Sequence, residues 1–196
     1  MRSAPELRIR PAVAGDAPRL AEFAARTFTE TYAGEIPPRQ IREHLDSSFG
    51  VELQAGEIVD PDTETLLAFM DESLVAYAQL RRRPAPKGLS AAATVELRRF
   101  YLDRATQGRG VAPVLMAAVR EAARSLGNGM LWLSVWERNP RAIGFYRRMG
   151  FSDAGATEFF VGTERQTDRV MVAAIARPAQ DSGVRPPPPG REGEIQ

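Results

Sequence analysis

Residues 95–112 have the sequence Val95-Glu96-Leu97-Arg98-Arg99-Phe100-Tyr101-Leu102-Asp103-Arg104-Ala105-Thr106-Gln107-Gly108-Arg109-Gly110-Val111-Ala112. The first half is rich in β-branched, aromatic and aliphatic side chains and predicts a strand over residues 94–102. A glycine-rich turn leads from there into residues 114–119, whose composition favours a helix. Pro113 suits the first turn of that helix, where a missing N–H costs little. Glycines at a helix start leave backbone N–H groups uncovered at the positive end of the helix dipole, which suits phosphate oxygens.

The segment beyond this helix completes a strand–helix–strand unit. The helix is expected to end near Leu126-Gly127, and the apolar run at 130–136 predicts the next strand. A unit of this length places its two strands parallel, with the glycine turn at the carboxyl end of the first strand, where open α/β sheets bind ligands. Residues 137–140 then form a turn into a short helix at 141–149, which is capped by Gly150.

The remaining segments predict further elements around this unit. Before it we expect a strand at 7–10, a helix from an Asp16 N-cap through Phe28, a loop at 29–34, a helix from Pro37-Pro38, a hairpin of strands 65–70 and 74–82, and a mobile loop at 84–88. After it we expect strands at 152–161 and 169–175, joined by residues 162–168. The Pro-rich residues 178–196 predict a disordered tail. The chain is therefore expected to hold one α/β domain at 1–177.

Composition excludes several classes of function. The chain has 196 residues, a formal charge of +1, no cysteine and a single histidine, His44. The small charge argues against nucleic-acid or membrane partners held by bulk electrostatics. Without cysteine there is no disulfide or thiolate nucleophile, and one histidine makes a metal site improbable, so we expect no metal and a bland surface or packing role for His44. No signal peptide or membrane span is evident, which makes a cytoplasmic protein the default.

The glycine turn by itself does not identify its ligand. The Walker A pattern is absent from the sequence. A dinucleotide fingerprint would need a third Gly or Ala where Pro113 stands, and it would follow a first strand instead of lying in the middle of the chain. A tight connection with no ligand remains an equal alternative at this point.

Two blocks of sequence resemble a known family. Gln107-x-x-Gly110-x-Ala112 after Phe-Tyr-Leu-Asp, and Asn139-Pro140-Arg141-Ala142-Ile143-x-Phe145-Tyr146-x-x-x-Gly150-Phe151, are similar to the two signature blocks of the GNAT superfamily of acetyl-CoA-dependent N-acetyltransferases. The resemblance spans residues 7–176. Residues 132–139 and the later Gly162…Gln166-Thr167-Asp168…Met171 resemble the PaiA-like branch, which is linked to acetylation of spermidine and other polyamines, although Ser134 stands where that branch often has Gly.

The resemblance implies a GNAT fold and acetyl-CoA as cosubstrate. The fold is a mixed central sheet of about seven strands, splayed between strands 4 and 5 and flanked by about four helices. Acetyl-CoA would lie in the splay, with its pyrophosphate on backbone N–H groups of residues 107–112 and with charge from Arg109 and Arg104. The implied cofactor-binding residues are Phe100, Tyr101, Leu102, Gln107, Gly108, Arg109, Gly110, Val111, Ala112, Asn139 and Tyr146.

The same resemblance implies catalytic roles for Glu96 and Tyr146. An acceptor amine with a pKa near ~10 is protonated at neutral pH and needs a base, for which Glu96 stands at the matching position. A regular strand would place Glu96, Arg98 and Phe100 on one face. The alternative for Glu96 is an ion pair with a neighbouring arginine. Tyr146 would protonate the departing thiolate, and its alternative is aromatic packing; Asn139 would bind the pantetheine arm, cap its helix, or do both.

The acceptor is the least determined part. Glu30, Tyr32, Glu35 and Glu158 lie in segments that border an amine cleft, whereas Trp132 and Trp136 fit core positions better. Three hypotheses follow: acetylation of a polyamine or other small-molecule amine, acetylation of a protein N-terminus or lysine, and a non-catalytic CoA-binding sensor. A homodimer is compatible with each of them.

Overall fold

The computed structural model describes residues 6–86, 89, 94–127, 129–161 and 164–175. The tail predicted at 178–196 and part of the loop predicted at 84–88 lie outside these residues. The described elements are β1 (Leu7–Pro11), the 3-10 turn η1 (Ala14–Asp16), α1 (Ala17–Tyr32), α2 (Pro38–Ser48), α3 (Val51–Val59), β2 (Thr63–Met70), β3 (Ser73–Arg82), β4 (Thr94–Leu102), the 3-10 turn η2 (Arg104–Thr106), α4 (Val111–Leu126), β5 (Met130–Trp136), α5 (Pro140–Arg148), β6 (Ser152–Val161) and β7 (Glu164–Ala174).

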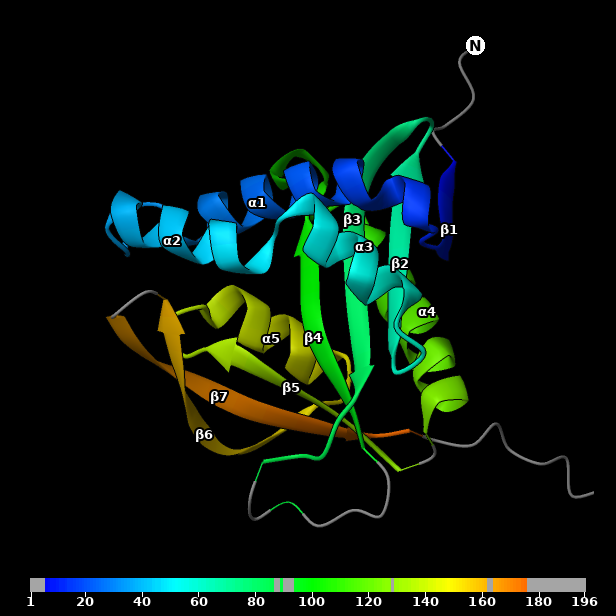
Figure 1. The fold of residues 1–196 in the computed structure, drawn as a ribbon. Helices are drawn as coiled ribbons and strands as arrows, with labels where there is room; N and C mark the ends of the chain where they lie inside the picture. Colours follow the sequence, from blue (N-terminus) through cyan, green and yellow to red (C-terminus); the bar gives the residue numbers. More distant parts are fainter. Residues whose placement is uncertain (1–5, 87–88, 90–93, 128, 162–163, 176–196) are drawn as a thin grey trace, which may run out of the picture.

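The strands form one mixed sheet that opens in its middle. Seven strands follow the order β1-β2-β3-β4-β5-β7-β6, and only β4 and β5 run parallel. These two pair at three positions, the last being Glu96 with Trp132. Beyond them β4 stays paired with β3 as far as Leu102, and β5 stays paired with β7 as far as Trp136. The predicted splay between strands 4 and 5 is thus confirmed, and Figure 1 shows β4 and β5 diverging.

A β-bulge in β4 lies where the strands part. Opposite β3, Gln79 pairs with Arg99 and Leu80 with Leu97, so Arg98 is the extra residue. An extra residue bends its strand and reverses the alternation of side chains beyond it. Phe100 accordingly packs with Leu97 on one face, whereas Arg99 points to the other. The prediction that Glu96 and Phe100 share a face is wrong for this reason.

Helices cover both faces of the sheet and enclose two hydrophobic clusters (Figure 1). On one face α4 and α5 pack against the sheet around Leu115, Met116 and Val119. On the other face α1 and α2 enclose a cluster that includes Phe28, Tyr77 and Trp136. The two clusters alternate along β2, where Leu66 and Leu67 face opposite sides, as expected for a strand buried on both faces.

The structure corrects three sequence predictions. Residues 29–32 continue α1 instead of forming a loop, because the Thr29 and Thr31 hydroxyls donate to carbonyls one turn earlier and Tyr32 buries its ring one turn beyond Phe28. A fifth helix, α3, was not predicted; it forms because Gln54 and Glu57 bond to buried groups of the sheet. Within the described residues the helices therefore number five, and not about four.

Two further corrections concern local detail. Asp16 precedes α1, but its carboxylate accepts hydrogen bonds from the Val13 N–H and from Arg10 instead of capping α1. β7 begins at Glu164 and not at 169, because residues 164–168 pair with residues of β6 despite their polar composition.

Among the described residues no helix has the length and apolarity needed to cross a bilayer.

Candidate active site

The glycine turn after β4 has the geometry of an anion cradle. Gly108 and Gly110 both have a φ of 83°, which is strained for any residue with a side chain. A Cβ at either position would meet no atom within 4 Å, so the turn faces open space. Inside the turn the Gln107 and Arg109 N–H groups donate to Arg104 and Thr106 carbonyls. The N–H groups at the start of α4 have no helical partners, and they are the donors that a pyrophosphate would meet.

Cationic side chains surround this turn. Arg104 and Arg109 are exposed on it, where the sequence predicted them. Arg141, in the first turn of α5, donates to the Gln107 side-chain carbonyl at 2.5 Å. This contact joins the starts of α4 and α5 and brings a third guanidinium to the cradle. The sequence analysis did not predict a role for Arg141, although it lies within the second signature block.

Between the turn and the sheet, β4 offers an unpaired backbone edge. Apart from the bulged Arg98, residues 97–102 pair with β3 on one side, and among the described strands they have no partner on the β5 side. An unpaired edge accepts an extended ligand as an added strand. The predicted pantetheine-binding residues Phe100, Tyr101 and Leu102 lie on this edge, so the turn and the edge together fit the residues predicted for acetyl-CoA.

Tyr146 and Asn139 lie at the same opening. The Asn139 side chain caps α5 by accepting the Ala142 N–H at 3.0 Å, which is one of its two predicted roles. The Tyr146 ring is 8% exposed and packs edge-on against Phe100 at 6.2 Å between ring centroids. None of the hydrogen bonds found among the described residues involves its hydroxyl. Burial raises the pKa of Tyr146, and nearby Tyr101 adds to the rise.

Glu96 lies at the closed end of the opening, where it forms the last β4–β5 pair with Trp132. Its carboxylate accepts hydrogen bonds from Arg81 at 2.9 and 3.3 Å, and Arg83 lies 3.8 Å away. This is the ion pair that the sequence left open as an alternative. The role of Glu96 as a base stays a prediction.

The acidic candidates for acceptor binding are spread around the opening. Glu30 pairs with Arg26 at 3.1 Å, Glu35 with Arg138 at 3.9 Å, and Glu158 with Arg165 at 2.8 Å. The pairs of Glu35 and Glu158 are exposed, whereas Glu30 is half-buried. Tyr32 differs from them, because its buried ring packs against Trp136 at 5.4 Å between ring centroids. Trp136 and Trp132 are both buried, as expected of core residues.

Asp168 is a carboxylate that the sequence analysis missed. It lies in β7 opposite Trp136, and only 6% of the residue is exposed. Burial raises the pKa of Asp168 to about 6, and the Glu137 carboxylate adds to the rise. Its charge in turn contributes to the raised pKa of Tyr32 and Tyr101. Because Tyr101 is on β4 and Asp168 is on the β5–β7 side, these groups face each other across the splay.

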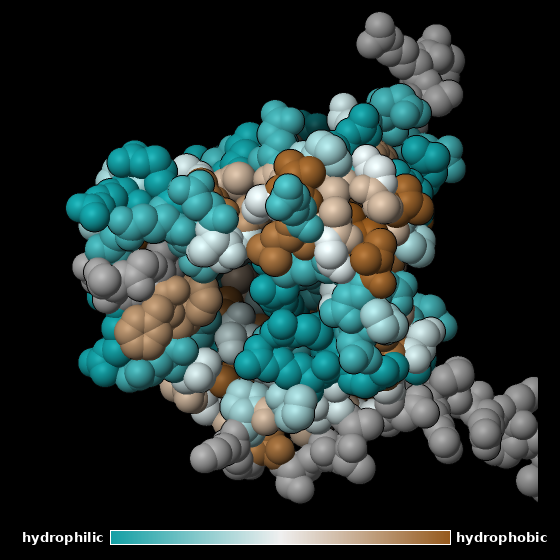
Figure 2. Space-filling model, in the orientation of Figure 1, coloured by the Kyte–Doolittle hydropathy of each residue, from teal (hydrophilic) through white to brown (hydrophobic). Residues whose placement is uncertain are grey.

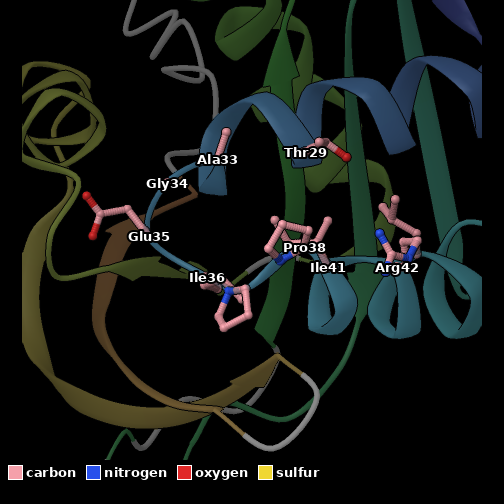
Figure 3. Close-up of a pocket in the computed structure, with 10 residues that line it drawn as sticks. Thr29, Ala33, Gly34, Glu35, Ile36, Pro38, Ile41 and Arg42 are labelled. Carbon is pink, nitrogen blue, oxygen red and sulfur yellow. The ribbon is translucent and has the colours of Figure 1, made fainter.

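A second open space adjoins this region. The surface is hollowed between the helices above and the strands below, and hydrophilic side chains border the hollow (Figure 2). A pocket of about 590 Å³ lies between the end of α1 and the start of α2, lined by Thr29, Ala33, Gly34, Glu35, Ile36, Pro37, Pro38, Ile41, Arg42 and Leu45. Glu35 points away from the other labelled side chains (Figure 3).

No group of three or more His, Cys, Asp or Glu among the described residues could hold a metal ion.

Comparison with known proteins adds to this geometry. A sequence profile of the acetyltransferase (GNAT) family matches residues 20–151. The chain belongs to the GNAT family. This acetyltransferase is 34% identical over 160 residues to an uncharacterized N-acetyltransferase of Mycobacterium tuberculosis (strain ATCC 25618 / H37Rv), with 82% of this chain and 98% of that protein covered. It is therefore an acetyl-CoA-dependent N-acetyltransferase.

Solved structures share its fold. The PaiA N-acetyltransferase from Thermoplasma acidophilum in complex with coenzyme A gives a TM-score of 0.71 at 22% identity, covering 86% of this chain and 99% of that one. The ribosomal-protein-S18-alanine N-acetyltransferase from Escherichia coli gives 0.61 at 17% identity, covering 90% and 98%. At these identities the likeness establishes the fold of the acetyltransferase and leaves its acceptor open.

Proposed function

We propose that this acetyltransferase acetylates a primary amine of a small molecule, with a polyamine such as spermidine as the leading candidate, by direct attack of the amine on the thioester. The observation that supports the proposal is the unpaired edge of β4, which ends close to the glycine turn and includes Tyr101, a residue that interacts electrostatically with Asp168 and with Tyr146. An acyl donor held along that edge would present its thioester to an acceptor in the splay. The chain has no cysteine to form a thioester intermediate of its own.

Tyr146 is the proposed acid. A phenol can protonate a thiolate of comparable basicity, and a raised pKa keeps the phenol protonated at neutral pH. The backbone N–H groups of residues 100–102 are proposed to polarise the thioester carbonyl. The N–H groups at the start of α4, with Arg104, Arg109 and Arg141 nearby, are proposed to hold the pyrophosphate.

A protein N-terminus or lysine is the second candidate acceptor. The similarity in fold to the ribosomal-protein-S18-alanine N-acetyltransferase supports a peptide amine as an alternative acceptor. The pocket between α1 and α2 is open to the surface and could receive a side chain of a peptide. Both candidates present a primary amine to the same opening, so turnover must distinguish them.

The experiment is a panel of acceptors assayed with acetyl-CoA for thiol release, with mass spectrometry of the products. Spermidine, other alkylamines and short peptides are compared. Turnover of free amines and not of peptides supports the proposal, and the reverse supports the second candidate. No turnover of any free amine would refute the proposal.

Two variants test the proposed roles in the same assay. Tyr146→Phe is expected to lower kcat by about 100-fold, the usual contribution of a positioned acid. Glu96→Gln is expected to lower kcat by a similar factor if Glu96 is the base, and by only a few-fold if Glu96 mainly pairs with Arg81. Unchanged turnover in Tyr146→Phe would remove the acid from the mechanism.

A further inference from the structure

Asp168 combines deep burial with a free hydrogen-bonding capacity. The residue is 6% exposed, and its Oδ1 is fully enclosed without a hydrogen-bond partner among the described residues. Oδ2 also has no partner among them, but it is not fully enclosed. No arginine of the described chain forms a salt bridge with this carboxylate, whereas Asp16, Asp103 and Asp153 each have one. A buried carboxylate without a cation is costly, which points to a cationic ligand.

The surroundings of Asp168 suit an ammonium group. On the α1 side, Tyr32 packs over Trp136, the residue that pairs with Asp168 in the sheet. The indole N–H of Trp136 donates to Gln166 at 3.0 Å, which fixes the ring at this position. Two aromatic rings beside a carboxylate provide cation–π attraction as well as a charge partner. Tyr101 faces the same carboxylate from β4, and Glu137 adds a second negative charge at the end of β5.

We propose that Asp168 receives the ammonium group of the acceptor and takes up its proton before the amine attacks the thioester. This inference rests on the proposed function and names the acceptor-binding residue of that same site. It also selects the acceptor class, since a group that binds here must carry a cationic primary amine.

The proton balance is complete with the residues present. The Asp168 carboxylate accepts one proton from R–NH3⁺, and the resulting R–NH2 forms a bond to the thioester carbon. The carbon–sulfur bond breaks, the CoA thiolate takes the phenolic proton of Tyr146, and the phenolate then takes the second proton from the new amide nitrogen. Asp168 returns its proton to solvent when the product leaves. The sum is R–NH3⁺ plus acetyl-CoA giving the N-acetylamine, CoA–SH and one proton.

The position of Asp168 fits this step better than that of Glu96. Glu96 already accepts hydrogen bonds from Arg81 and belongs to the last β4–β5 pair, at the closed end of the opening. Asp168 lies opposite Trp136, at the far end of β5, where the strands stand apart. The raised pKa of Asp168 also brings its proton affinity closer to that of an amine, and the titratable groups that face it are Tyr32 from α1, Tyr101 from β4 and Glu137 after β5.

The test compares the wild type, Asp168→Asn and Asp168→Glu as full-length chains. For Asp168→Asn, kcat/KM for the amine is expected to fall at least about 30-fold, the effect of removing one partner of a buried charge pair, while the KM for acetyl-CoA stays unchanged. Asp168→Glu is expected to recover part of the loss. In the wild type, kcat/KM is expected to show an acidic limb near pH 6 that is absent from Asp168→Asn. Binding of spermidine to the CoA-loaded protein, measured by calorimetry, is expected to weaken in parallel.

Asp153→Asn is the matched control. Asp153 lies on the neighbouring strand β6 and forms a partly exposed pair with Arg169, so its kinetics are expected to equal those of the wild type. Equal amine binding and equal kcat/KM in wild type and Asp168→Asn would overturn the inference while leaving the proposed function intact. Amine binding that depends on Asp168 without acetyl transfer would overturn the proposed function and keep the amine site. A wild type that neither binds nor acetylates any amine would overturn both.

Discussion

At the scale of single residues, the unpaired carboxylate of Asp168 lowers the stability of the fold at neutral pH, in contrast to the paired carboxylates. Paired carboxylates such as Asp16 and Asp103 have a lowered pKa, chiefly through hydrogen bonds from Arg10 and from the Ala105 N–H respectively, and they favour folding at neutral pH. Asp168 behaves in the opposite way, because burial raises its pKa. A residue that costs folding energy in this manner is expected where a ligand later supplies the missing partner.

The first prediction is the pH dependence of stability that Asp168 causes. A pKa raised from 3.8 to about 6 means that the folded state holds the proton more tightly than the unfolded state. Protonation of Asp168 therefore adds about 3 kcal/mol to the free energy of unfolding below pH 4. This contribution is lost as the pH rises through 6. Urea unfolding at several pH values is expected to show Asp168→Asn gaining stability relative to the wild type as the pH rises from 5 to 7. A constant difference between the two proteins would contradict the prediction.

At the scale of elements, β4, the bulge within it and the glycine turn after it shape the candidate site. The bulge at Arg98 bends the strand just after its last pair with β5, and this frees the edge at 97–102. Arg98 and Arg99 both reach Glu57 of α3, so the bulge is held from the helix side. At the other end of the strand, Gly108 and Gly110 turn the chain into α4.

The second prediction concerns Gly110→Ala. An alanine held at the φ of 83° that Gly110 adopts would be strained by about 1–2 kcal/mol. To relieve this strain, the backbone at the first turn of α4 is expected to shift away from the cradle geometry. The KM for acetyl-CoA is expected to rise about tenfold, with less effect on the KM for the amine. Gly56→Ala in α3 is the control, because its Cβ would meet no atom and alanine favours a helix interior; it is expected to stabilise the protein by up to about 1 kcal/mol. An unchanged KM for acetyl-CoA in Gly110→Ala would show that the cradle is not used.

The third prediction concerns Glu57→Gln. Although burial opposes its ionisation, Arg99 and Gln79 lower the pKa of Glu57, so the carboxylate is charged at neutral pH. Removing that charge leaves the buried Arg99 guanidinium without its anion and is expected to cost about 3 kcal/mol in urea unfolding. Glu43→Gln, which breaks the exposed pair with Arg39, is the control and is expected to cost less than about 0.5 kcal/mol. A similarly small cost for Glu57→Gln would mean that Arg99 is satisfied without it.

At the scale of the whole molecule, the splay divides the sheet into two parts. β1 to β4 carry α1, α3 and α4, while β5, β7 and β6 form the other part, and the two are joined by a short β4–β5 pairing (Figure 1). Trp136 in the hydrophobic cluster of α1 and α2 also connects them. A ligand that bridges β4 and α5 should therefore stabilise the fold as a whole.

The fourth prediction is the response of thermal stability to CoA. At a CoA concentration of about 100 times its Kd, binding stabilises the folded state by about 2.7 kcal/mol, which corresponds to a rise in Tm of roughly 5–10 °C. Pantetheine, which lacks the pyrophosphate, is expected to give a smaller rise in Tm than CoA at the same concentration. Arg141→Ala is expected to reduce the rise in Tm that CoA causes. Differential scanning fluorimetry measures each shift. Equal shifts for CoA and pantetheine would place the pyrophosphate away from the turn.

The local pattern of the chain was sufficient for most elements and for the glycine turn that precedes α4. Apolar runs predicted the β2–β3 hairpin and β5, and the positions of Gly108, Gly110 and Pro113 predicted the turn and the start of α4. These features depend on residues close together in sequence, where backbone geometry and side-chain type act directly. α3 could not be predicted, because the polar groups that fix it, Gln54 and Glu57, meet their partners only across the sheet.

The amino-acid sequence by itself determined the family, the parallel pairing and splay of the two central strands, and the position of the glycine turn that we propose binds the CoA pyrophosphate. Only the tertiary structure decided which acids are paired, and that Asp168 is buried without a cationic partner among the described residues. Glu96 meets Arg81 through strand pairing, and Glu35 and Glu158 meet arginines from other segments, whereas the Glu30 pair with Arg26 is local to α1. Asp168 was assigned to a connection, and its charge became significant when β6 and β5 enclosed it within the sheet. The physical reason is that burial and ion pairing are long-range properties, set by residues that the local sequence does not bring together.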